Sequence, residues 1–570
     1  MAENTQKIAR RARKQNGVHY TPPELAAFLA TETVKALTRT DAPICVLDPA
    51  CGDGVLLWAI AAALEPRRRA RTTLVGYETD ERAISLAERS LSGCGVANVS
   101  LRLQDFLDRD FDEPYDAVIA NPPYVRTQVL GADRAQVLAE RFGLTGRVDL
   151  SYAFIRSISN ALRPGGVVGL LTSNRFLTVR AGAMTRSLLR TEFETRALYD
   201  LGDTKLFSAA VLPAITIAVR RPEGRGLASH PPKAMRKDQT LVPTTFTRVY
   251  SCTSGDAVAA QESNLLETLS DCSLSGIIRA SEGHFRIERG VLADTAKPDD
   301  VWRLKQPKSE RWLSRVRAAQ AMMFGDVATI RVGIKTTADA VFVRSDWHEL
   351  PEAIRPEEEL LRPLITHREA TRWSITPTRN QRRVLYPHLS RGGRRVPIEL
   401  EDFPRTAAYL RSHEARLRGR RYVTDAGRRW YEIWVAHDPA AWAQPKIAFP
   451  DIAESPRFSL DRSGAVVQGD CYWITLKPGV DARWLPLMLA VANSSLATKF
   501  YDILFHNKLY AGRRRYMTQY VEQFPLPRLE AFASRTIVAR SEELCATNPG
   551  RNVLEREIEA VVEKAFGLDD

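Results

Sequence analysis

The fold of this chain is decided by the stretch ICVLDPACGDG at residues 44–54. Its opening apolar run predicts a buried strand, and the residues from Val55 to about Leu64 predict a helix. Gly52 and Gly54 lie between them, in the strand–turn–helix arrangement in which backbone approaches a nucleoside-type ligand closely. A glycine turn of this kind is weak evidence when taken alone.

Acidic residues follow the next two predicted strands. The strand over 73–77 ends at Glu78, and the strand over 99–103 precedes Asp105 and Phe106. Parallel strands of an α/β sheet end at one edge, so these residues and the glycine turn outline one adenosine pocket. Glu78 can accept from the ribose hydroxyls and Asp105 from an adenine amino group, while Phe106 covers the ring. Taken singly, each acid fits a helix cap or a surface position better.

The residues NPPY at 121–124 follow a fourth predicted strand over 117–120. Pro122 and Pro123 stiffen this loop and provide no amide donor. The side-chain oxygen of Asn121 and the carbonyl of Pro122 can accept both hydrogens of a planar NH₂ group, and Tyr124 offers a ring to stack on. The exocyclic amine of adenine fits this description. A Pro-rich turn without function is the alternative.

In this order, the motifs resemble those of the gamma-class N6-adenine DNA methyltransferases of type II restriction–modification systems. The resemblance implies S-adenosylmethionine as the cofactor and NPPY as the catalytic loop, with Asn in first place marking N6-adenine rather than N4-cytosine. The N-terminal motif GVHYTPP at 17–23 also matches. The implied cofactor-binding residues are Tyr20, Thr21, Asp48, Pro49, Ala50, Gly52, Gly54, Glu78, Asp105, Phe106 and Asn121.

The resemblance also implies that the target adenine leaves the duplex. The catalytic residues are then Asn121, Pro122, Pro123 and Tyr124, and the flipped base stacks on Tyr124 and Phe207. Phe207 can also be read as an ordinary core phenylalanine. DLSY at 149–152 resembles the next motif of the family. Positioning and electrostatics carry the methyl transfer, and no metal ion is implied.

The predicted fold class is α/β, with a doubly wound seven-stranded Rossmann-like methyltransferase domain over residues 15–222. A mixed α+β DNA target-recognition domain is expected over 301–530. A basic N-terminal arm occupies 1–14, and 223–300 forms a linker or intermediate region with weak strand signals and no assigned role. The C-terminal helical segment, 531–570, includes a predicted amphipathic helix over 552–567.

The second half is rich in arginine and aromatic residues. Residues 361–430 hold 17 Arg and 6 acids but no Lys, interleaved with rings from Trp373 to Trp434. Such residues can grip phosphates, read guanine and stack on bases, although a solvated arginine-rich surface explains the pattern equally well. Segments at 331–343, 444–447, 493–495 and 509–527 resemble the family's target-recognition domain. The candidate DNA contacts are Arg331, Lys335, Arg394, Arg395, Lys508, Arg513, Arg514 and Arg515.

Composition agrees with a DNA-binding protein. The net charge of +13 favours a polyanionic partner, here double-stranded DNA. The 7 cysteines form no Cys-x-x-Cys pair, which indicates reduced thiols in the cytoplasm. No signal segment or membrane span is expected. We expect a monomer that is not fused to a nuclease and acts beside a separately encoded restriction endonuclease.

The predicted function is sequence-specific methylation of adenine N6, which protects host DNA from the cognate endonuclease. RNA-adenine and protein-glutamine methyltransferases share the NPPY loop but are usually shorter chains. A non-enzymatic DNA-binding protein with a decayed methyltransferase domain is opposed by the intact motifs. A modification component of a multi-subunit phage-defence system is a further alternative, against which the built-in recognition half argues.

Overall fold

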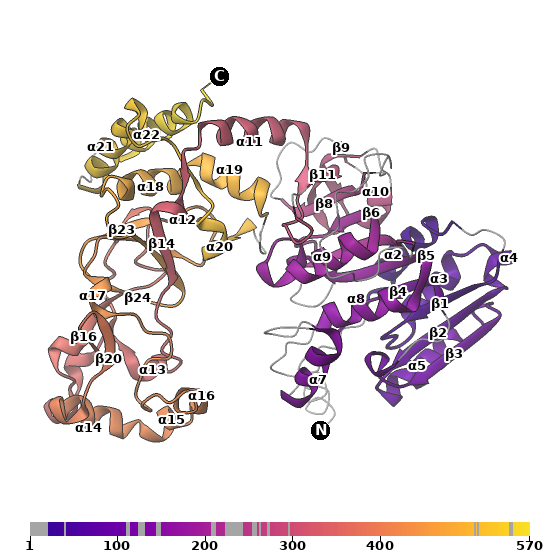
Figure 1. Cartoon of the computed structure of the whole chain (residues 1–570), viewed down its shortest axis with the longest axis horizontal. Coiled ribbons are helices and arrows are strands. Elements are labelled where there is room, and N and C mark those ends of the chain that lie inside the picture. The colour runs from indigo at the N-terminus through magenta and orange to yellow at the C-terminus, as the bar shows by residue number, and fades with distance from the viewer. Residues whose placement is uncertain are drawn as a thin grey trace. The chain divides into compact units, whose positions relative to one another are not determined.

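The computed structural model describes most of the chain. The described residues are 21–38, 42–109, 114–123, 132–143, 150–206, 212–222, 243–252, 259–260, 264–270, 274–294, 297–506, 509, 512–546 and 551–569. They form two compact units. The first unit extends to Gln306, and the second begins at Pro307; Leu509–Gly512 group with the first. Figure 1 colours the first unit from indigo to magenta and ends the second in yellow.

The first unit is built on one large sheet. Its strands lie in the order β3-β2-β1-β4-β5-β7-β6-β8-β11-β10-β9, with β12 paired to β11. Strands β1 to β5 run parallel to one another, whereas β7 runs antiparallel to both β5 and β6. The bounds are β1 (Ile44–Asp48), β2 (Thr72–Glu78), β3 (Asn98–Leu103), β4 (Tyr115–Ala120), β5 (Leu162–Ser173), β6 (Phe193–Asp200), β7 (Pro213–Arg220), β8 (Thr245–Ser251), β9 (Ala259–Ala260), β10 (Gly276–Ala280), β11 (Gly283–Leu292) and β12 (Leu304–Lys305).

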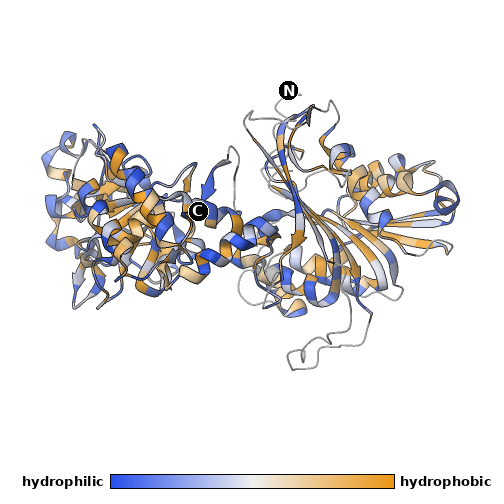
Figure 2. Ribbon diagram, turned by 90° about the horizontal axis from the view of Figure 1, so that it is seen from above, coloured by the Kyte–Doolittle hydropathy of each residue, from blue (hydrophilic) through white to orange (hydrophobic). Residues whose placement is uncertain are grey.

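Alternate residues of the central strands enter two different cores. Ala117 and Ile119 of β4 pack in one hydrophobic cluster, while Val118 and Ala120 pack in the other. Because side chains alternate across a strand, the continuous apolar runs read from the sequence bury both faces of the sheet. Figure 2 shows apolar residues along these strands.

Helices cover both faces of the sheet. Residues of α2 and α3 pack in the cluster that holds Ile119, and residues of α8 and α9 pack in the cluster that holds Val118. This is the doubly wound arrangement that the sequence predicts. The helices are α2 (Pro23–Lys35), α3 (Val55–Ala63), α4 (Pro66–Arg69), α5 (Glu81–Leu91), α7 (Ala132–Phe142), α8 (Leu150–Ala161), α9 (Ala183–Glu192) and α10 (Leu265–Ser270), with 3₁₀ turns η1 (Phe106–Asp108), η2 (Asn174–Leu177) and η3 (Arg180–Gly182).

Seven strands, β1 to β7, lie within the domain predicted over 15–222, but the sheet continues beyond it and has twelve strands among the described residues. Of the five additional strands, β8 to β11 lie in the region 223–300, which has no assigned role, and β12 lies at the start of the predicted target-recognition domain. Strand β8 pairs parallel to β6, which would otherwise be an edge strand with unpaired backbone groups. Two of the added strands have only two residues, and such segments leave little periodic signal.

The second unit contains several smaller sheets. Five strands form one sheet in the order β14-β25-β21-β23-β17, four form another in the order β15-β18-β16-β24, and β19 and β20 form a hairpin. The remaining pairs are β13–β27 and β22–β26. The bounds are β13 (Met322–Met323), β14 (Ala328–Val332), β15 (Val343–Arg344), β16 (Leu361–Ile365), β17 (Trp373–Ser374), β18 (Arg383–Leu385), β19 (His388–Arg391), β20 (Arg394–Pro397), β21 (Lys446–Pro450), β22 (Ile452–Ala453), β23 (Ser459–Asp461), β24 (Val466–Val467), β25 (Cys471–Leu476), β26 (Arg514–Arg515) and β27 (Pro525–Leu526).

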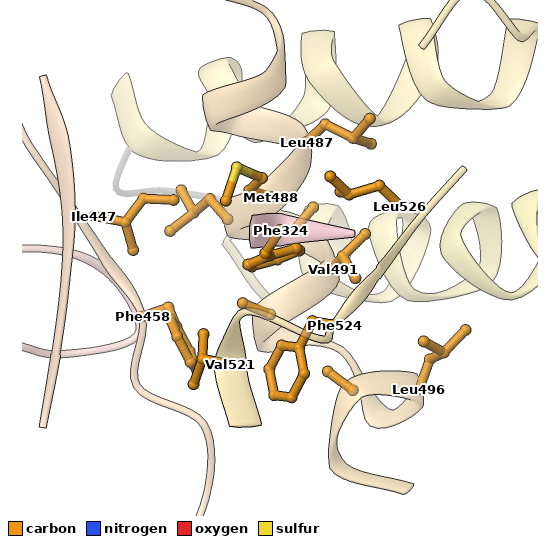
Figure 3. Close-up of a cluster of buried hydrophobic side chains, with 14 of the residues drawn as sticks. Phe324, Ile447, Phe458, Leu487, Met488, Val491, Leu496, Val521, Phe524 and Leu526 are labelled. Atoms are coloured by element: carbon orange, nitrogen blue, oxygen red, sulfur yellow. The ribbon is translucent and has the colours of Figure 1, made fainter. Parts of the chain in front are cut away.

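One apolar core joins the five-stranded sheet of this unit to its C-terminal helices. Every residue of α18 is buried, and Met488 and Val491 lie near Phe324 and Phe524 in Figure 3. Ile558 of α22 belongs to the same cluster. The helices are α11 (Pro307–Ala319), α12 (Phe324–Val327), α13 (Asp339–Phe342), α14 (Pro404–Ser412), α15 (Glu414–Arg418), α16 (Arg421–Thr424), α17 (Pro439–Trp442), α18 (Trp484–Asn493), α19 (Ser495–Leu504), α20 (Thr518–Val521), α21 (Phe532–Ala546) and α22 (Arg551–Ala565), with 3₁₀ turns η4 (Trp347–Glu349), η5 (Glu352–Ile354), η6 (Glu358–Leu360) and η7 (Leu400–Asp402).

The amphipathic helix predicted over 552–567 is confirmed as α22. Of the helices that the structure describes, none combines the length and the apolar character needed to cross a bilayer.

Candidate active site

Four predicted site residues lie at one edge of the large sheet. Asp48 ends β1, Glu78 ends β2, and Asp105 and Asn121 follow β3 and β4. These strands are parallel and lie in the order β3-β2-β1-β4, so the chain order reverses between β1 and β4. In open α/β sheets the crevice at such a switch point, beyond the carboxyl ends of the strands, is where ligands bind.

The glycine turn after β1 brings backbone to this crevice. Gly52 and Gly54 have φ angles of 52° and 82°, in the left-handed region that favours glycine. Gly54 precedes α3, and a Cβ there would meet the Cβ of Ala87 at 3.1 Å. Pro49 is buried and Ala50 is half-buried beside it. The turn thus presents backbone amides and the amino end of a helix, which suits a ligand that needs close approach.

Asp48 is a buried carboxyl with an incomplete set of partners. Its Oδ1 accepts from the Ala50 amide at 3.1 Å, whereas Oδ2 is buried with no hydrogen-bond partner among the described residues. The pKa of Asp48 is raised to about 8, mainly by burial and also by the negative charges of Glu78 and Asp53, while the hydrogen bond from the Ala50 amide lowers it. A buried oxygen of this kind is expected to meet a donor or a cation supplied by a ligand.

Glu78 is fixed by backbone amides. Its Oε2 accepts from the Gly52 amide at 3.0 Å, and its Oε1 accepts from the amides of Thr79 at 2.7 Å and Asp80 at 3.0 Å. The contact with Gly52 ties the end of β2 to the glycine turn. Its carboxylate is therefore held in one orientation at the crevice, with lone pairs left to accept hydroxyl donors.

Asp105 caps η1, the role that the helix-capping alternative gave it. Its Oδ1 accepts from the Leu107 amide at 2.9 Å. Its Oδ2 lies 2.6 Å from a guanidinium nitrogen of Arg134, a residue that sequence analysis did not identify because it lies in a segment without a motif. Phe106 is 1% exposed and packs against Tyr77 and Phe154.

Asn121 follows β4 directly and is held by the N-terminal motif. Its Nδ2 donates to the hydroxyl of Thr21 at 3.0 Å, which orients the amide so that Oδ1 points away from Thr21. Thr21 is buried, Pro122 is buried and Pro123 is half-buried. The bond joins two motifs that lie 100 residues apart in the sequence. Tyr20, Tyr124, Phe207 and Lys508 lie outside the described residues.

In the second unit, four of the candidate DNA contacts are engaged within the protein. Arg514 forms two bonds of 2.8 Å with Asp502, and Arg515 contacts Asp451. Arg331 donates to Thr475 and lies over the ring of Trp473, and Arg395 donates to the carbonyl of Ala436. These arginines stabilise the unit itself.

Three other candidates have exposed side chains: Lys335, Arg394 and Arg513. None of the three has an ion pair among the residues that the structure describes. Arg394 lies at the tip of the β19–β20 hairpin, directly opposite Arg391. Like charges in such a pair repel, and an anionic partner relieves the repulsion.

The aromatic residues of the arginine-rich region are mostly core residues. Trp373, Tyr386, Tyr409 and Tyr431 are each at most 2% exposed, so these rings cannot stack on bases as the composition suggested. Tyr422 is 44% exposed. Composition misleads here because aromatic rings fill cores as readily as they contact nucleic acid.

Known proteins resemble this chain over nearly its whole length. The family model described as Eco57I restriction-modification methylase matches residues 96–207, which include Asp105 and Asn121. Type II methyltransferase M.BanIII of Aneurinibacillus aneurinilyticus is 37% identical over 580 residues, covering 98% of each chain. Type II methyltransferase M.BstVI of Geobacillus stearothermophilus is 24% identical over 558 residues, covering 91% of each.

The chain belongs to the type II methyltransferases of restriction–modification systems. It is a DNA methyltransferase, and its cofactor is S-adenosylmethionine. A solved DrdV–DNA complex shares the fold of this methyltransferase, with a TM-score of 0.53 at 11% identity over 94% of this chain and 57% of that chain.

The residues at the sheet edge suit this cofactor. S-adenosylmethionine carries positive charge on its sulfur and amino group, two ribose hydroxyls and an adenine ring. The buried Oδ2 of Asp48 is a partner for positive charge, and the fixed carboxylate of Glu78 is an acceptor for hydroxyls. Gly52 and Gly54 have no side chain and adopt positive φ angles, so a ligand can approach the backbone closely at these two positions.

Proposed function

We propose that this methyltransferase methylates N6 of adenine within a specific sequence of double-stranded DNA and so protects host DNA from a cognate restriction endonuclease. The position of Asn121 carries the proposal. It follows β4 at the switch point of the sheet, and Thr21 holds its amide. The oxygen of an amide fixed in this way can accept a hydrogen bond from the amine that receives the methyl group.

The catalytic loop acts by holding the amine. In adenine the lone pair of this nitrogen is delocalised into the ring, which makes it a poor nucleophile. Oδ1 of Asn121 and the carbonyl of Pro122 accept its two hydrogens and favour a more pyramidal nitrogen. Pro122 and Pro123 bring no competing amide donors to the loop. Orientation of the acceptor and electrostatic stabilisation then lower the barrier.

The strand ends on the other side of the switch point hold the cofactor. When bound, S-adenosylmethionine supplies an activated methyl group on a positively charged sulfur. Asp48 offers its buried Oδ2 to positive charge, Glu78 accepts from the ribose hydroxyls, and Asp105 accepts from the adenine amino group. The remaining contacts that we propose come from Tyr20, Thr21, Pro49, Ala50, Gly52, Gly54, Phe106 and Asn121.

The target base must leave the helix to reach this loop. Inside a duplex the N6 amine is stacked and paired, so we propose that the base flips out and stacks on Tyr124 and Phe207. Flipping costs a few kcal/mol, which DNA contacts of the second unit offset.

We propose that the second unit recognises the target sequence. The exposed side chains of Lys335, Arg394 and Arg513 are the candidates for direct DNA contact. The hairpin β19–β20 carries Arg391 and Arg394 at its tip, and a two-stranded ribbon fits the DNA major groove. Arg331, Arg395, Arg514 and Arg515 instead make contacts within the second unit.

Product analysis tests the proposal. The purified chain is incubated with isotope-labelled S-adenosylmethionine and a duplex library, and the DNA is then digested to nucleosides. Label in N6-methyladenine is expected, with none in N4-methylcytosine. Label in N4-methylcytosine would contradict the adenine assignment, and label found only when RNA or protein replaces DNA would contradict the substrate.

A further inference from the structure

A second polar cluster lies at the same sheet edge, beyond Asn121. It consists of Asn174, Asp200, Arg248 and Tyr250, and we name it the Asp200 cluster. Asn174 follows β5, Asp200 ends β6, and Tyr250 lies near the end of β8. Strands β5 and β6 are both antiparallel to β7, β5 is parallel to β4, and β8 is parallel to β6, so the carboxyl ends of β4, β5, β6 and β8 share one edge. None of these residues belongs to the motifs read from the sequence.

Asp200 is the centre of the cluster. Its Oδ1 accepts from Nδ2 of Asn174 at 2.8 Å, and its two oxygens lie 3.4 and 3.3 Å from the hydroxyl of Tyr250. Nδ2 of Asn174 also donates to the same hydroxyl at 3.1 Å. Nε of Arg248 lies 3.6 Å from Oδ2. These contacts link β5, β6 and β8 around one buried carboxyl.

The cluster fixes the turn that follows β6. The Gly202 amide donates to Oδ1 of Asp200 at 3.2 Å. Gly202 has a φ of 45°, and a Cβ there would lie 2.5 Å from the carbonyl oxygen of Val249 in β8. One residue later, Asp203 accepts from the amide of Ser251 at 2.7 Å and from its hydroxyl. Strand β8, which lies outside the predicted seven-stranded sheet, therefore determines the path of this turn.

The turn lies on the side of the switch point opposite to the proposed cofactor residues, where the target base is expected. The proposed cofactor residues Asp48, Glu78 and Asp105 come from β1, β2 and β3, on one side of β4. Strand β5 lies on the other side of β4, with Leu170 paired to Ala120, the residue before Asn121. A group held by β5, β6 and β8 at this edge therefore lies on the side of the amine-binding loop away from the proposed cofactor residues.

Burying the carboxyl of Asp200 costs free energy, which its hydrogen-bond and charge partners must offset. Its side chain is 3% exposed, and burial raises its pKa while Arg248 and Asn174 oppose the rise. A buried carboxyl needs a nearly complete set of partners, and such sets hold their members in one geometry. In this chain, the partners of Asp200 hold the turn over 201–204 in one conformation.

We propose that Asp200, held by Asn174 and Tyr250, is a positioning residue for the flipped target base and that β8 is part of the acceptor site. The proposal rests on the function proposed above. It assigns a purpose to the added strands: they keep the turn after β6 at the distance that the extruded base requires. Cofactor binding does not depend on the cluster.

The test removes a single hydroxyl, in the variant Tyr250→Phe. The matched control is Tyr115→Phe, because Tyr115 is equally buried, at 8% exposed, and lies at the opposite end of β4. Steady-state methylation of a duplex with the target site gives kcat and KM for DNA. A duplex with 2-aminopurine at the target adenine reports base extrusion by fluorescence, and calorimetry gives the affinity for S-adenosylhomocysteine.

Tyr250→Phe is expected to lower base extrusion and kcat/KM for DNA by about tenfold, because small displacements of reacting groups cost up to about a hundredfold. Tyr115→Phe should match the wild type, and S-adenosylhomocysteine affinity should be unchanged in both. The variant Asp200→Asn, which keeps the size of the side chain, should show a larger loss in the same direction.

Equal extrusion and equal kcat/KM in Tyr250→Phe and Tyr115→Phe, with an active wild type, would overturn the positioning role alone. A loss of S-adenosylhomocysteine affinity in parallel with activity would also overturn it, because a general structural defect would then explain both. A wild type that leaves adenine unmethylated would overturn the proposed function, and this proposal with it.

Discussion

The sheet edge of the first unit and the arginine-rich surface of the second are both polar, but they use their polar groups differently. At the sheet edge, Glu78 accepts from backbone amides of the neighbouring turns. In the second unit, Arg514 and Arg515 are neutralised by Asp502 and Asp451. A side chain held by backbone keeps capacity for a ligand, whereas a paired charge is largely consumed. Charge content alone therefore does not locate a binding surface.

The largest expected effect concerns Asn121. Asn121→Ala removes one of the two acceptors for the target amine and should lower the rate of methyl transfer by at least about a hundredfold. DNA and cofactor affinities should stay near those of the wild type. Single-turnover kinetics with isotope-labelled cofactor measure the rate, and Asn98→Ala is the matched control, since Asn98 is exposed at the amino end of β3. Near-normal turnover of Asn121→Ala would contradict the assignment of the catalytic loop.

The next effect concerns Asp48, the buried carboxyl at the edge of the large sheet. Burial raises the pKa of Asp48 to about 8 from an ordinary value of 3.8. Between these pH values the folded chain keeps a proton that the unfolded chain releases, so in the absence of cofactor this group lowers stability as pH rises from about 4 to 8. Asp48→Asn cannot ionise and lacks this loss, so at pH 8.5 it should gain on the order of a few kcal/mol relative to the wild type.

Urea unfolding at pH 5 and pH 8.5 measures the difference for Asp48→Asn. The free energy of unfolding of the variant should fall less between the two pH values than that of the wild type. Identical changes in the two proteins would show that Asp48 titrates normally and would contradict a buried oxygen that requires a donor or cation from the ligand.

A third prediction separates two adjacent arginines. Arg514→Ala removes the guanidinium that pairs with Asp502, in a contact whose two side chains are only 14% and 24% exposed. It should lower the free energy of unfolding by about 2 kcal/mol. Denaturant unfolding measures this, with Arg513→Ala as the control that should unfold like the wild type. Equal stability of the two variants would show that the Arg514 ion pair contributes little.

The smallest effect is on DNA binding by Arg513. If its exposed guanidinium contacts a phosphate, Arg513→Ala should weaken DNA binding to all sequences alike and reduce the slope of log K against log salt by about 1. Fluorescence anisotropy at several salt concentrations provides the slope. An unchanged slope for Arg513→Ala, Arg394→Ala and Lys335→Ala together would place the DNA contacts elsewhere.

The two units also differ in how much of them the sequence could predict. The strands ending at Asp48 and Glu78, the helices after them and their common edge could be predicted, because parallel strands with apolar runs place their ends together. Asn174 and Asp200 follow strands in the same way, and the same rule would have marked them. The short strands after residue 244 could not be predicted, since they become strands only by pairing with β6 and with one another.

In the second unit the sequence could not distinguish structural arginines from available ones. Arg515 and Asp451 are 64 residues apart, and Arg331 and Thr475 are 144 apart. Such pairs depend on tertiary packing that no local pattern records. Trp373 and Tyr386 likewise belong to the core only because distant segments close over them.

The most direct test of the central claim is modification-sensitive single-molecule sequencing of genomic DNA from a methylation-deficient host. One culture expresses the wild-type chain and the other expresses Asn121→Ala. We predict N6-methyladenine at one recurring motif in the first culture and none in the second. A mark on cytosine, a mark that survives Asn121→Ala, or no mark on any adenine would contradict it.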